Sequence, residues 1–261
     1  MKTLETLCQL AEKVKEKNYV DENFTHNLSL FTFHSTAIEG ATLSVIETQN
    51  LIEKDITANG KSLSDHLMVK DHHEALLFTL QLATKREQLT IEHLKIINAL
   101  VNKHKEGYVE NVVGKVYFNS GEFRKSNVKA GETVFMNYSK VLANVIQFLD
   151  RLNKNIQQKD IGKIYELSFE AHFNVVNIHP WLDGNGRTSR LIMNYIQEYH
   201  QLPKTFISKD DRNEYIAAII KTRETNNKKH ILDFCTKQGI KAFKQRLGHD
   251  GKSKKGMSFL I

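Results

Sequence analysis

The stretch that decides the fold is residues 161–203, IGKIYELSFEAHFNVVNIHPWLDGNGRTSRLIMNYIQEYHQLP. Apolar residues recur at helical spacing through residues 160–177 and again from residue 187 to about 200, shortly before Pro203. Between the two segments lies His-Pro-Trp-Leu-Asp-Gly-Asn-Gly, a run rich in residues that end helices and form turns. The stretch therefore predicts two helices joined by a tight corner.

The corner concentrates side chains that are suited to binding a polyphosphate. Residues 179–190 supply a titratable base, a carboxylate, a Gly-Asn-Gly turn and two arginines. The backbone N–H groups of Gly184–Gly186 are expected to point outward at the start of the second helix, where they would form a nest for an anion. Arg187 and Arg190 are three residues apart, so they are expected to share one helix face.

Two residues of the corner are candidates for chemistry. Asp183 can hold Mg²⁺, because this ion takes one or two carboxylates and completes its shell with water and substrate oxygens. His179, with an ordinary pKa of about 6.5, can accept a proton from an attacking hydroxyl at neutral pH. The alternative is a surface turn with solvated arginines. The presence of all these groups in one order favours a functional site.

The corner resembles the signature of the Fic family, H-P-F-x-[D/E]-G-N-G-R-x-x-R, with Trp181 in place of the usual phenylalanine. The resemblance implies an all-α fold with a Fic-domain helical core. It also implies transfer of AMP from ATP–Mg²⁺ to a Ser, Thr or Tyr hydroxyl of a protein, with release of pyrophosphate. The Doc-like branch that phosphorylates its target is not expected, because its loop lacks the complete Gly-Asn-Gly nest.

The resemblance implies a role for each matching residue. His179 is the general base, Asp183 the metal ligand and Asn185 a contact to the α-phosphate. Arg190 holds the γ-phosphate. The other implied phosphate contacts are Gly184, Gly186 and Arg187.

A second motif, Ser35-Thr36-Ala37-Ile38-Glu39-Gly40, lies near the N-terminus. Gly40 is a typical helix stop, which places Glu39 at a helix C-terminus, where a negative charge gains from an external cation. Taken alone, the pattern indicates a solvated glutamate. Beside the signature it resembles the family's inhibitory motif, [S/T]-x-x-x-E-[G/N], in the class with an N-terminal inhibitory helix. The resemblance implies that Glu39 pairs with Arg190 in place of the γ-phosphate, and Ser35 on the same face is expected to orient Glu39.

Residues 107–136 depart from helical spacing, with glycines and β-branched residues that predict a loop and a short hairpin. Within them, Gly121-Glu122-Phe123-Arg124 resembles the edge of the family's flap, which covers the nucleotide and pairs with the backbone of the target. Gly121 and Phe123 are therefore implied nucleotide contacts. A plain surface hairpin is the alternative.

Another helix is expected after Ser208, with Tyr215, Ile216, Ile219 and Ile220 on its buried side. Arg212 and Tyr215 resemble an R-x-x-Y pattern whose tyrosine lines the adenine pocket. A buried structural tyrosine is the alternative. Arg223 or Asn226 falls near the place of the asparagine with which the family often contacts adenine.

Length and composition fit a globular helical protein. The chain has 261 residues, 40% hydrophobic and 26% charged, and only two prolines interrupt it. We expect an N-terminal helical region at 1–84 carrying the inhibitory helix, a catalytic core at 85–235 and a basic helix and tail at 236–261. The two cysteines suggest no disulfide scaffold, and no signal peptide or membrane span is evident, so a cytoplasmic location is expected.

The sequence leaves three functions open. The first is an autoinhibited adenylyltransferase, using ATP and Mg²⁺, that modifies a target protein or itself. The second is removal of AMP from a modified protein by a water that Glu39 positions. The third is a non-catalytic binding module, suggested only by the net charge of +7 and the lysines of the C-terminal segment. Nucleic acid and membrane are not expected as partners, and a homodimer is one alternative for the oligomeric state.

Overall fold

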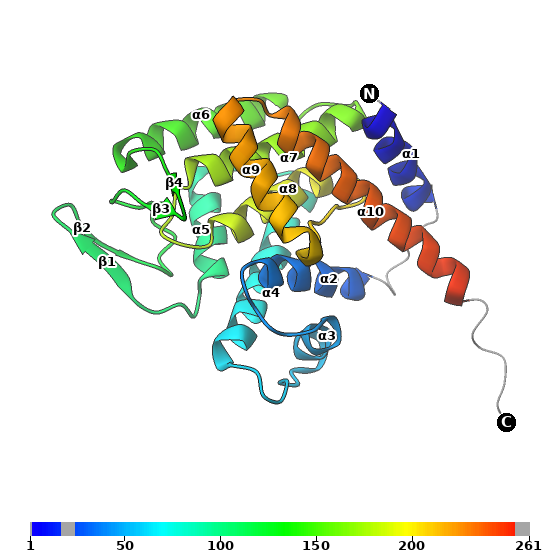
Figure 1. Ribbon diagram of the computed structural model, residues 1–261, viewed down its shortest axis with the longest axis horizontal. Helices are drawn as coiled ribbons and strands as arrows, with labels where there is room; N and C mark the ends of the chain where they lie inside the picture. Colours follow the sequence, from blue (N-terminus) through cyan, green and yellow to red (C-terminus); the bar gives the residue numbers. More distant parts are fainter. Residues whose placement is uncertain (1, 17–23, 254–261) are drawn as a thin grey trace.

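The computed structural model describes residues 2–16 and 24–253, which form ten α-helices and two small antiparallel hairpins (Figure 1). The helices are α1 (Lys2–Glu16), α2 (Phe24–Ile38), α3 (Val45–Lys54), α4 (Leu63–Thr84), α5 (Ile91–Val101), α6 (Val141–Asn155), α7 (Ile161–Ile178), α8 (Asn185–Tyr199), α9 (Arg212–Thr225) and α10 (Lys229–Ser253). The hairpins pair β1 (Tyr108–Asn111) with β2 (Gly114–Tyr117) and β3 (Lys129–Ala130) with β4 (Thr133–Val134). The predicted all-α class is confirmed.

Local signals explain where several helices begin. Ser44 and Glu47 form the capping box that starts α3, with the Glu47 carboxylate accepting the Ser44 N–H at 2.7 Å. Thr90 and Asp160 accept backbone N–H groups at the starts of α5 and α7. Ser208 caps the short 3₁₀ turn η3 (Lys209–Asp211), which leads directly into α9.

The central element is α8, whose side chains are buried along almost its whole length. It packs against α7 and α4, and both ends of the chain join the same core, since α1 packs against α10. The predicted boundary after residue 84 coincides with the end of α4. The boundary predicted between 235 and 236 falls inside α10, so no break in the backbone structure marks it. Lys254 and Lys255 of the predicted tail lie outside the described residues.

Residues 107–136 contain two hairpins where the sequence predicted one. The pair β1–β2 projects from the helical body (Figure 1), while β3–β4 returns to it. Gly121–Arg124 lies between the hairpins and belongs to neither. This difference determines which segment borders the candidate site.

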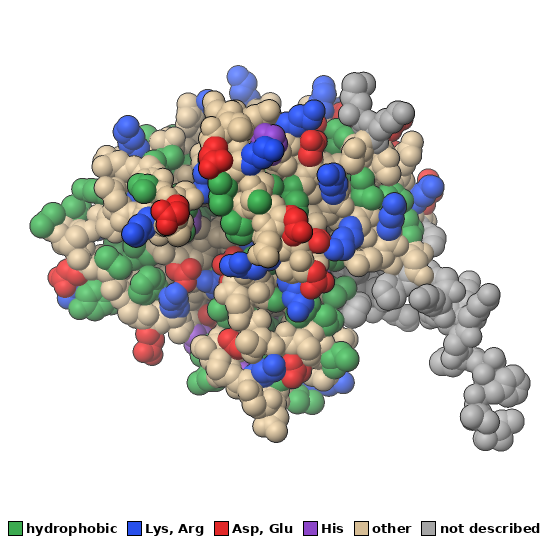
Figure 2. All heavy atoms as spheres, in the orientation of Figure 1, with side chains coloured by type: hydrophobic (Ala, Val, Ile, Leu, Met, Phe, Trp, Pro, Cys, Tyr) green, Lys and Arg blue, Asp and Glu red, His purple; other side chains and the backbone are tan. Residues whose placement is uncertain are grey.

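Charged side chains of both signs are interspersed over the face in Figure 2, so the excess of lysine and arginine does not form one basic patch there. Within residues 2–16 and 24–253, no helix combines the length and the apolar composition required for a membrane span.

Candidate active site

The corner between α7 and α8 is closed by its own side chains. α7 ends at Ile178, and His179 adopts the left-handed conformation with φ 52°. Asn185, the first residue of α8, accepts the Trp181 N–H at 3.0 Å and donates to the Trp181 carbonyl at 2.9 Å. The Asn185 side chain therefore fixes the loop, and only its backbone remains free to join an anion nest.

Trp181 anchors the loop from below and is only 1% exposed. Its indole N–H donates to the carbonyl of Gly121 at 2.8 Å, and Phe123 packs against its ring. A side chain at Gly121 would lie 2.1 Å from the carbonyl oxygen of Lys95, so this glycine allows the loop to pass close to α5. Gly121 and Phe123 thus support the corner from the side of Trp181.

The imidazole of His179 packs against an aromatic ring and lies near two arginines. Its ring stacks on Phe135, just after β4, with centroids 3.7 Å apart and planes 21° apart. The guanidinium of Arg223 lies over the same Phe135 ring at 4.8 Å, and Arg124 donates to the His179 carbonyl at 2.8 Å. Burial, with Arg223 and Arg124 nearby, lowers the pKa of His179 to about 4. The ring is therefore neutral at pH 7, the form that can accept a proton.

A carboxylate already lies over the predicted anion nest. Glu39 follows the C-terminus of α2, and a Cβ placed on Gly186 would be 2.5 Å from Glu39 Oε1. Only glycine at position 186 permits this approach. Arg190 donates to the same Oε1 at 2.8 Å. Burial alone would lower the pKa of Arg190, but the Glu39 carboxylate holds it above its ordinary value.

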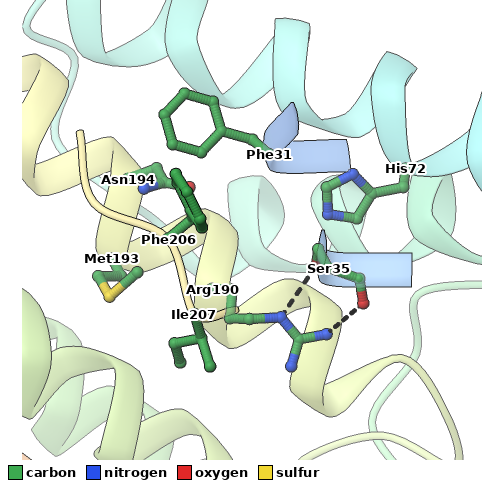
Figure 3. A pocket seen from close by; sticks show the side chains of 8 residues that line it. All are labelled: Phe31, Ser35, His72, Arg190, Met193, Asn194, Phe206 and Ile207. Carbon is green, nitrogen blue, oxygen red and sulfur yellow. Dashed lines mark hydrogen bonds between the residues drawn. The ribbon is translucent and has the colours of Figure 1, made fainter. Parts of the chain in front are cut away.

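Ser35 binds Arg190 directly. Figure 3 shows the guanidinium reaching from α8 to α2, where Nε donates to Ser35 Oγ at 2.9 Å and a second nitrogen donates to the Ser35 carbonyl at 2.8 Å. The hydroxyl thus orients the arginine, and the sequence-based expectation that it orients Glu39 named the wrong partner.

His72 of α4 lines the small cavity, about 10 Å³, beside this contact (Figure 3). The ring is 1% exposed. Burial, with Arg190 and Arg187 nearby, lowers its pKa well below the usual range. His72 is therefore neutral at pH 7, and no second positive charge opposes Arg190 from this side.

Asp183 lies in a separate cluster at the end of α5. Its Oδ2 accepts from the ammonium of Lys105, and Arg187 approaches the same oxygen at 3.4 Å. Arg187 also donates to the Val101 carbonyl at 2.8 Å and to Asn102 at 3.1 Å. The guanidinium of Arg187 is therefore directed to the C-terminus of α5, whereas Arg190 is directed to α2, although the two residues share a helix.

The Asp183 carboxyl is charged at neutral pH. Burial acts to raise its pKa, but Arg187, Lys105 and the Gly184 N–H together lower it below the ordinary value. Among the described residues, no group of three or more His, Cys, Asp or Glu side chains is placed to hold a metal. A single charged carboxylate fits Mg²⁺ when a substrate supplies further oxygens, and here a cationic ammonium already lies against that carboxylate.

A cavity of about 230 Å³ joins the Glu39–Arg190 pair to His179. Its lining is mainly apolar and includes three arginines. It comes from the end of α2, from α7, α8 and α9, and from the segment around β3–β4. The lining residues are Ile38, Glu39, Ala130, Thr133, Phe135, Val176, His179, Gly186, Arg190, Arg212, Tyr215, Ile216, Ile219, Ile220 and Arg223.

Tyr215 forms part of this lining, and its hydroxyl contacts His172 Nε2 at 2.7 Å. Burial raises the pKa of Tyr215 to about 12, so the phenol keeps its proton. Ile216 and Ile220 were expected to be buried, but each is 38% exposed because it faces the cavity. Of the two candidates for the contact to adenine, Arg223 lines the cavity and Asn226 caps the end of α9.

The structure brings five of the predicted site residues to this cavity: Glu39, Gly186, His179, Arg190 and Tyr215. Gly121, Phe123 and Arg187 are not in its lining, and their predicted contacts to nucleotide stay predictions. Sequence reasoning missed Phe135 and Lys105, which no motif distinguished. It also gave no role to Arg124, although the Gly-Glu-Phe-Arg stretch had been singled out.

Comparison with known proteins identifies relatives of this chain. Residues 88–197 match the family model described as Fic/DOC family, so this segment of the chain is a domain of that family. It is 30% identical over 184 residues to "Protein adenylyltransferase Fic" of Culex quinquefasciatus, covering 70% of this chain and 34% of that protein. The protein of the same name from Drosophila erecta is 26% identical over 185 residues, with the same coverage. The chain thus spans about a third of the length of these curated relatives.

Solved structures show the same fold. A Fic domain containing signaling protein from Bacteroides thetaiotaomicron superposes with a TM-score of 0.79 at 21% identity, covering 98% of this chain and 100% of that one. Fic-1 from C. elegans superposes with a TM-score of 0.78 at 24% identity, covering 97% of this chain and 73% of that one.

Proposed function

We propose that this chain is an autoinhibited protein adenylyltransferase that transfers AMP from ATP–Mg²⁺ to a Ser, Thr or Tyr hydroxyl of a protein. The observation that carries the proposal is the position of the Glu39 carboxylate, over Gly186 and paired with Arg190, in the cavity that His179 also lines. A glycine-rich helix N-terminus and an arginine together favour an anion, and a phosphate group has the charge and the acceptors to replace this carboxylate. The names of the curated relatives support the same activity.

In the proposed transfer, His179 and Asp183 have separate roles. The neutral imidazole of His179 removes the proton from the attacking hydroxyl. The hydroxyl oxygen then bonds to the α-phosphorus, the bond to the bridging oxygen between the α- and β-phosphates breaks, and pyrophosphate leaves. Asp183 would hold the Mg²⁺, which would supply positive charge to offset the charge of the phosphates. The apolar walls from α9 suit a base, since nucleotide pockets are largely apolar with few polar groups.

The segment around β3–β4 is the part of the chain best placed to receive a target. Ala130, Thr133 and Phe135 line the cavity beside His179. A short two-stranded hairpin has free edges to which an extended peptide can add by backbone hydrogen bonds. Such pairing selects the shape of the target backbone more than its side chains.

The test is incubation with α-labelled ATP and Mg²⁺, followed by measurement of label on protein. We expect Glu39→Gly to label itself or added protein faster than wild type, and Glu39→Gly/His179→Ala to label neither. Glu106→Gly is the control, because Glu106 is an exposed loop glutamate that does not line the cavity. Equal labelling by Glu39→Gly and wild type would show that the Glu39–Arg190 pair does not inhibit the transfer. Label that persists without His179 would show that His179 is not the general base.

Removal of AMP is a second candidate, favoured by the shared cavity of Glu39 and His179. The Glu39 side chain is 35% exposed, so a water can reach it. In this reaction the water attacks the phosphorus of the AMP–protein linkage, and the protein hydroxyl leaves with a proton. Loss of label from a pre-modified protein that requires Glu39 would support removal, whereas gain of label on Glu39→Gly supports transfer.

A further inference from the structure

The proposed metal ligand already has a cationic partner from another segment of the chain. Lys105 lies four residues after the end of α5, and its ammonium bonds to Asp183 Oδ2. The other carboxylate oxygen, Oδ1, accepts the Gly184 N–H at 2.6 Å. The oxygen that remains for a metal is therefore the one that Lys105 occupies.

The turn after α5 presents Lys105 to the corner. The Lys105 N–H donates to the Asn102 carbonyl at 2.9 Å, and the Asn102 amide donates to the backbone carbonyl of Asp183 at 3.3 Å. The Lys105 ammonium also lies 4.9 Å from the centre of the Phe118 ring. The backbone that carries Lys105 is thus fixed to the loop that carries Asp183.

Of the two cations at Asp183, only Lys105 is free to leave. Arg187 is 5% exposed and donates to two other acceptors at the end of α5. The Lys105 side chain is 46% exposed, and its flexible stem can carry the ammonium into solvent. Asp183 is 33% exposed on its side chain, so the exchange needs no opening of the core.

We infer that Lys105 is the resident counter-ion of Asp183, which Mg²⁺ must displace, and that it sets the metal concentration the site requires. This inference rests on the proposed metal role of Asp183. The exchange keeps the carboxylate paired throughout, because the ammonium leaves as the divalent ion arrives. Removing Lys105 removes this competitor, and so the metal should bind more tightly.

A titration with Mn²⁺ tests this in the presence of inorganic pyrophosphate, which supplies the further oxygens that a single carboxylate needs around the metal. The Gly184 amide donates to Asp183, so its NMR signal in ¹⁵N-labelled, deuterated protein should broaden when the paramagnetic ion binds there. We expect Lys105→Met to reach half-broadening at roughly three- to tenfold less Mn²⁺ than wild type. Methionine keeps a stem of similar length over Phe118 and removes only the charge.

Lys103→Met is the matched control. Lys103 lies in the same turn, is 47% exposed and pairs with Glu74 at 2.8 Å. Lys103→Met removes the same charge two residues away from Lys105. Its Mn²⁺ titration should match that of wild type, which would exclude a general effect of net charge. Asp183→Asn should need far more Mn²⁺ for the same broadening.

Two results would overturn the inference. One is equal Mn²⁺ requirement in Lys105→Met and wild type, and the other is undiminished broadening in Asp183→Asn. Because no ATP is present, failure of AMP transfer in the labelling assay leaves this titration informative, and the two failures are distinguishable.

Discussion

At the scale of single residues, the environment of His179 determines the pH at which its ring takes up a proton. Burial and two neighbouring arginines lower its pKa to about 4, against about 6.5 in an unfolded chain. The folded protein therefore binds fewer protons than the unfolded chain between these values. The stability that this contributes is complete above about pH 6.5 and is lost as the pH falls toward 4.

We predict that the His179 ring titrates near pH 4 in the free protein. NMR of its ring signals against pH measures this directly, and His179→Ala assigns them. Arg223→Leu should move the midpoint upward, because it removes the arginine whose charge lowers this pKa the more of the two. A midpoint near 6.5 in wild type would contradict the buried, cation-flanked environment.

Trp181 provides a second prediction at this scale. Trp181→Phe restores the usual residue of the family signature but leaves the buried Gly121 carbonyl without its indole donor. We expect a loss of about 1–3 kcal/mol in the free energy of unfolding. Urea denaturation followed by circular dichroism measures it, since the variant has no tryptophan fluorescence.

Phe123→Leu is the comparison for Trp181→Phe. It changes packing against the same ring and leaves the hydrogen bond in place. If Trp181→Phe proved as stable as wild type, the indole hydrogen bond would contribute nothing to holding the corner.

At the scale of elements, α2 is held to α8 and α9 by more than the Glu39 charge. Ser35 offers Arg190 both a hydroxyl and a carbonyl, and Arg212 of α9 donates to the Ile38 carbonyl at 2.8 Å. The proposed inhibitory contact therefore includes hydrogen bonds that fix Arg190 in the orientation in which it pairs with Glu39.

We predict that Ser35→Ala partly releases the inhibition. It removes one hydrogen bond to a charged donor, so AMP transfer should rise roughly three- to tenfold over wild type and stay below Glu39→Gly. The labelling assay measures it. Ser64→Ala, at an exposed position in α4, should behave as wild type. An unchanged rate in Ser35→Ala would show that Glu39 alone forms the inhibitory contact.

The element scale also explains what the sequence could predict. Caps such as Ser44, Thr90 and Asp160 act on residues three positions away, so their effects were visible in the pattern. The side chains of Asn185 and Arg187 find partners that depend on the closed corner and on α5, which lies about 85 residues earlier in the chain. Motif spacing alone carries no information on such partners.

Long-range packing also explains why the flap motif in the sequence does not mark the residues that line the cavity. Gly121 and Phe123 carry the recognisable motif, but they pack under Trp181, and the residues that line the cavity beside His179 come from the second hairpin. Two-residue strands give almost no periodicity, so β3 and β4 were not separable from the surrounding loop in the sequence. The pairing of Glu39 with Arg190, by contrast, was expected from the resemblance and is present in the structure.

At the scale of the whole molecule, α2, the proposed inhibitory helix, and the corner share one hydrophobic core, since buried residues of α2, α4, α7 and α8 form a single cluster. The partly exposed Glu39 carboxylate belongs to the cavity, so its removal should leave that core intact.

We predict that ATP–Mg²⁺ stabilises Glu39→Gly more than wild type, because in our proposal the wild-type carboxylate takes the place of a phosphate. At a ligand concentration one hundred times Kd, linkage gives about 2.7 kcal/mol, or a rise in Tm of roughly 5–10 °C for a chain of this size. Thermal unfolding with and without ATP–Mg²⁺ measures the difference, and Glu106→Gly should shift as little as wild type. Equal shifts in Tm for wild type and Glu39→Gly would mean that the carboxylate and the nucleotide do not compete. Any inhibition by Glu39 would then act on a later step.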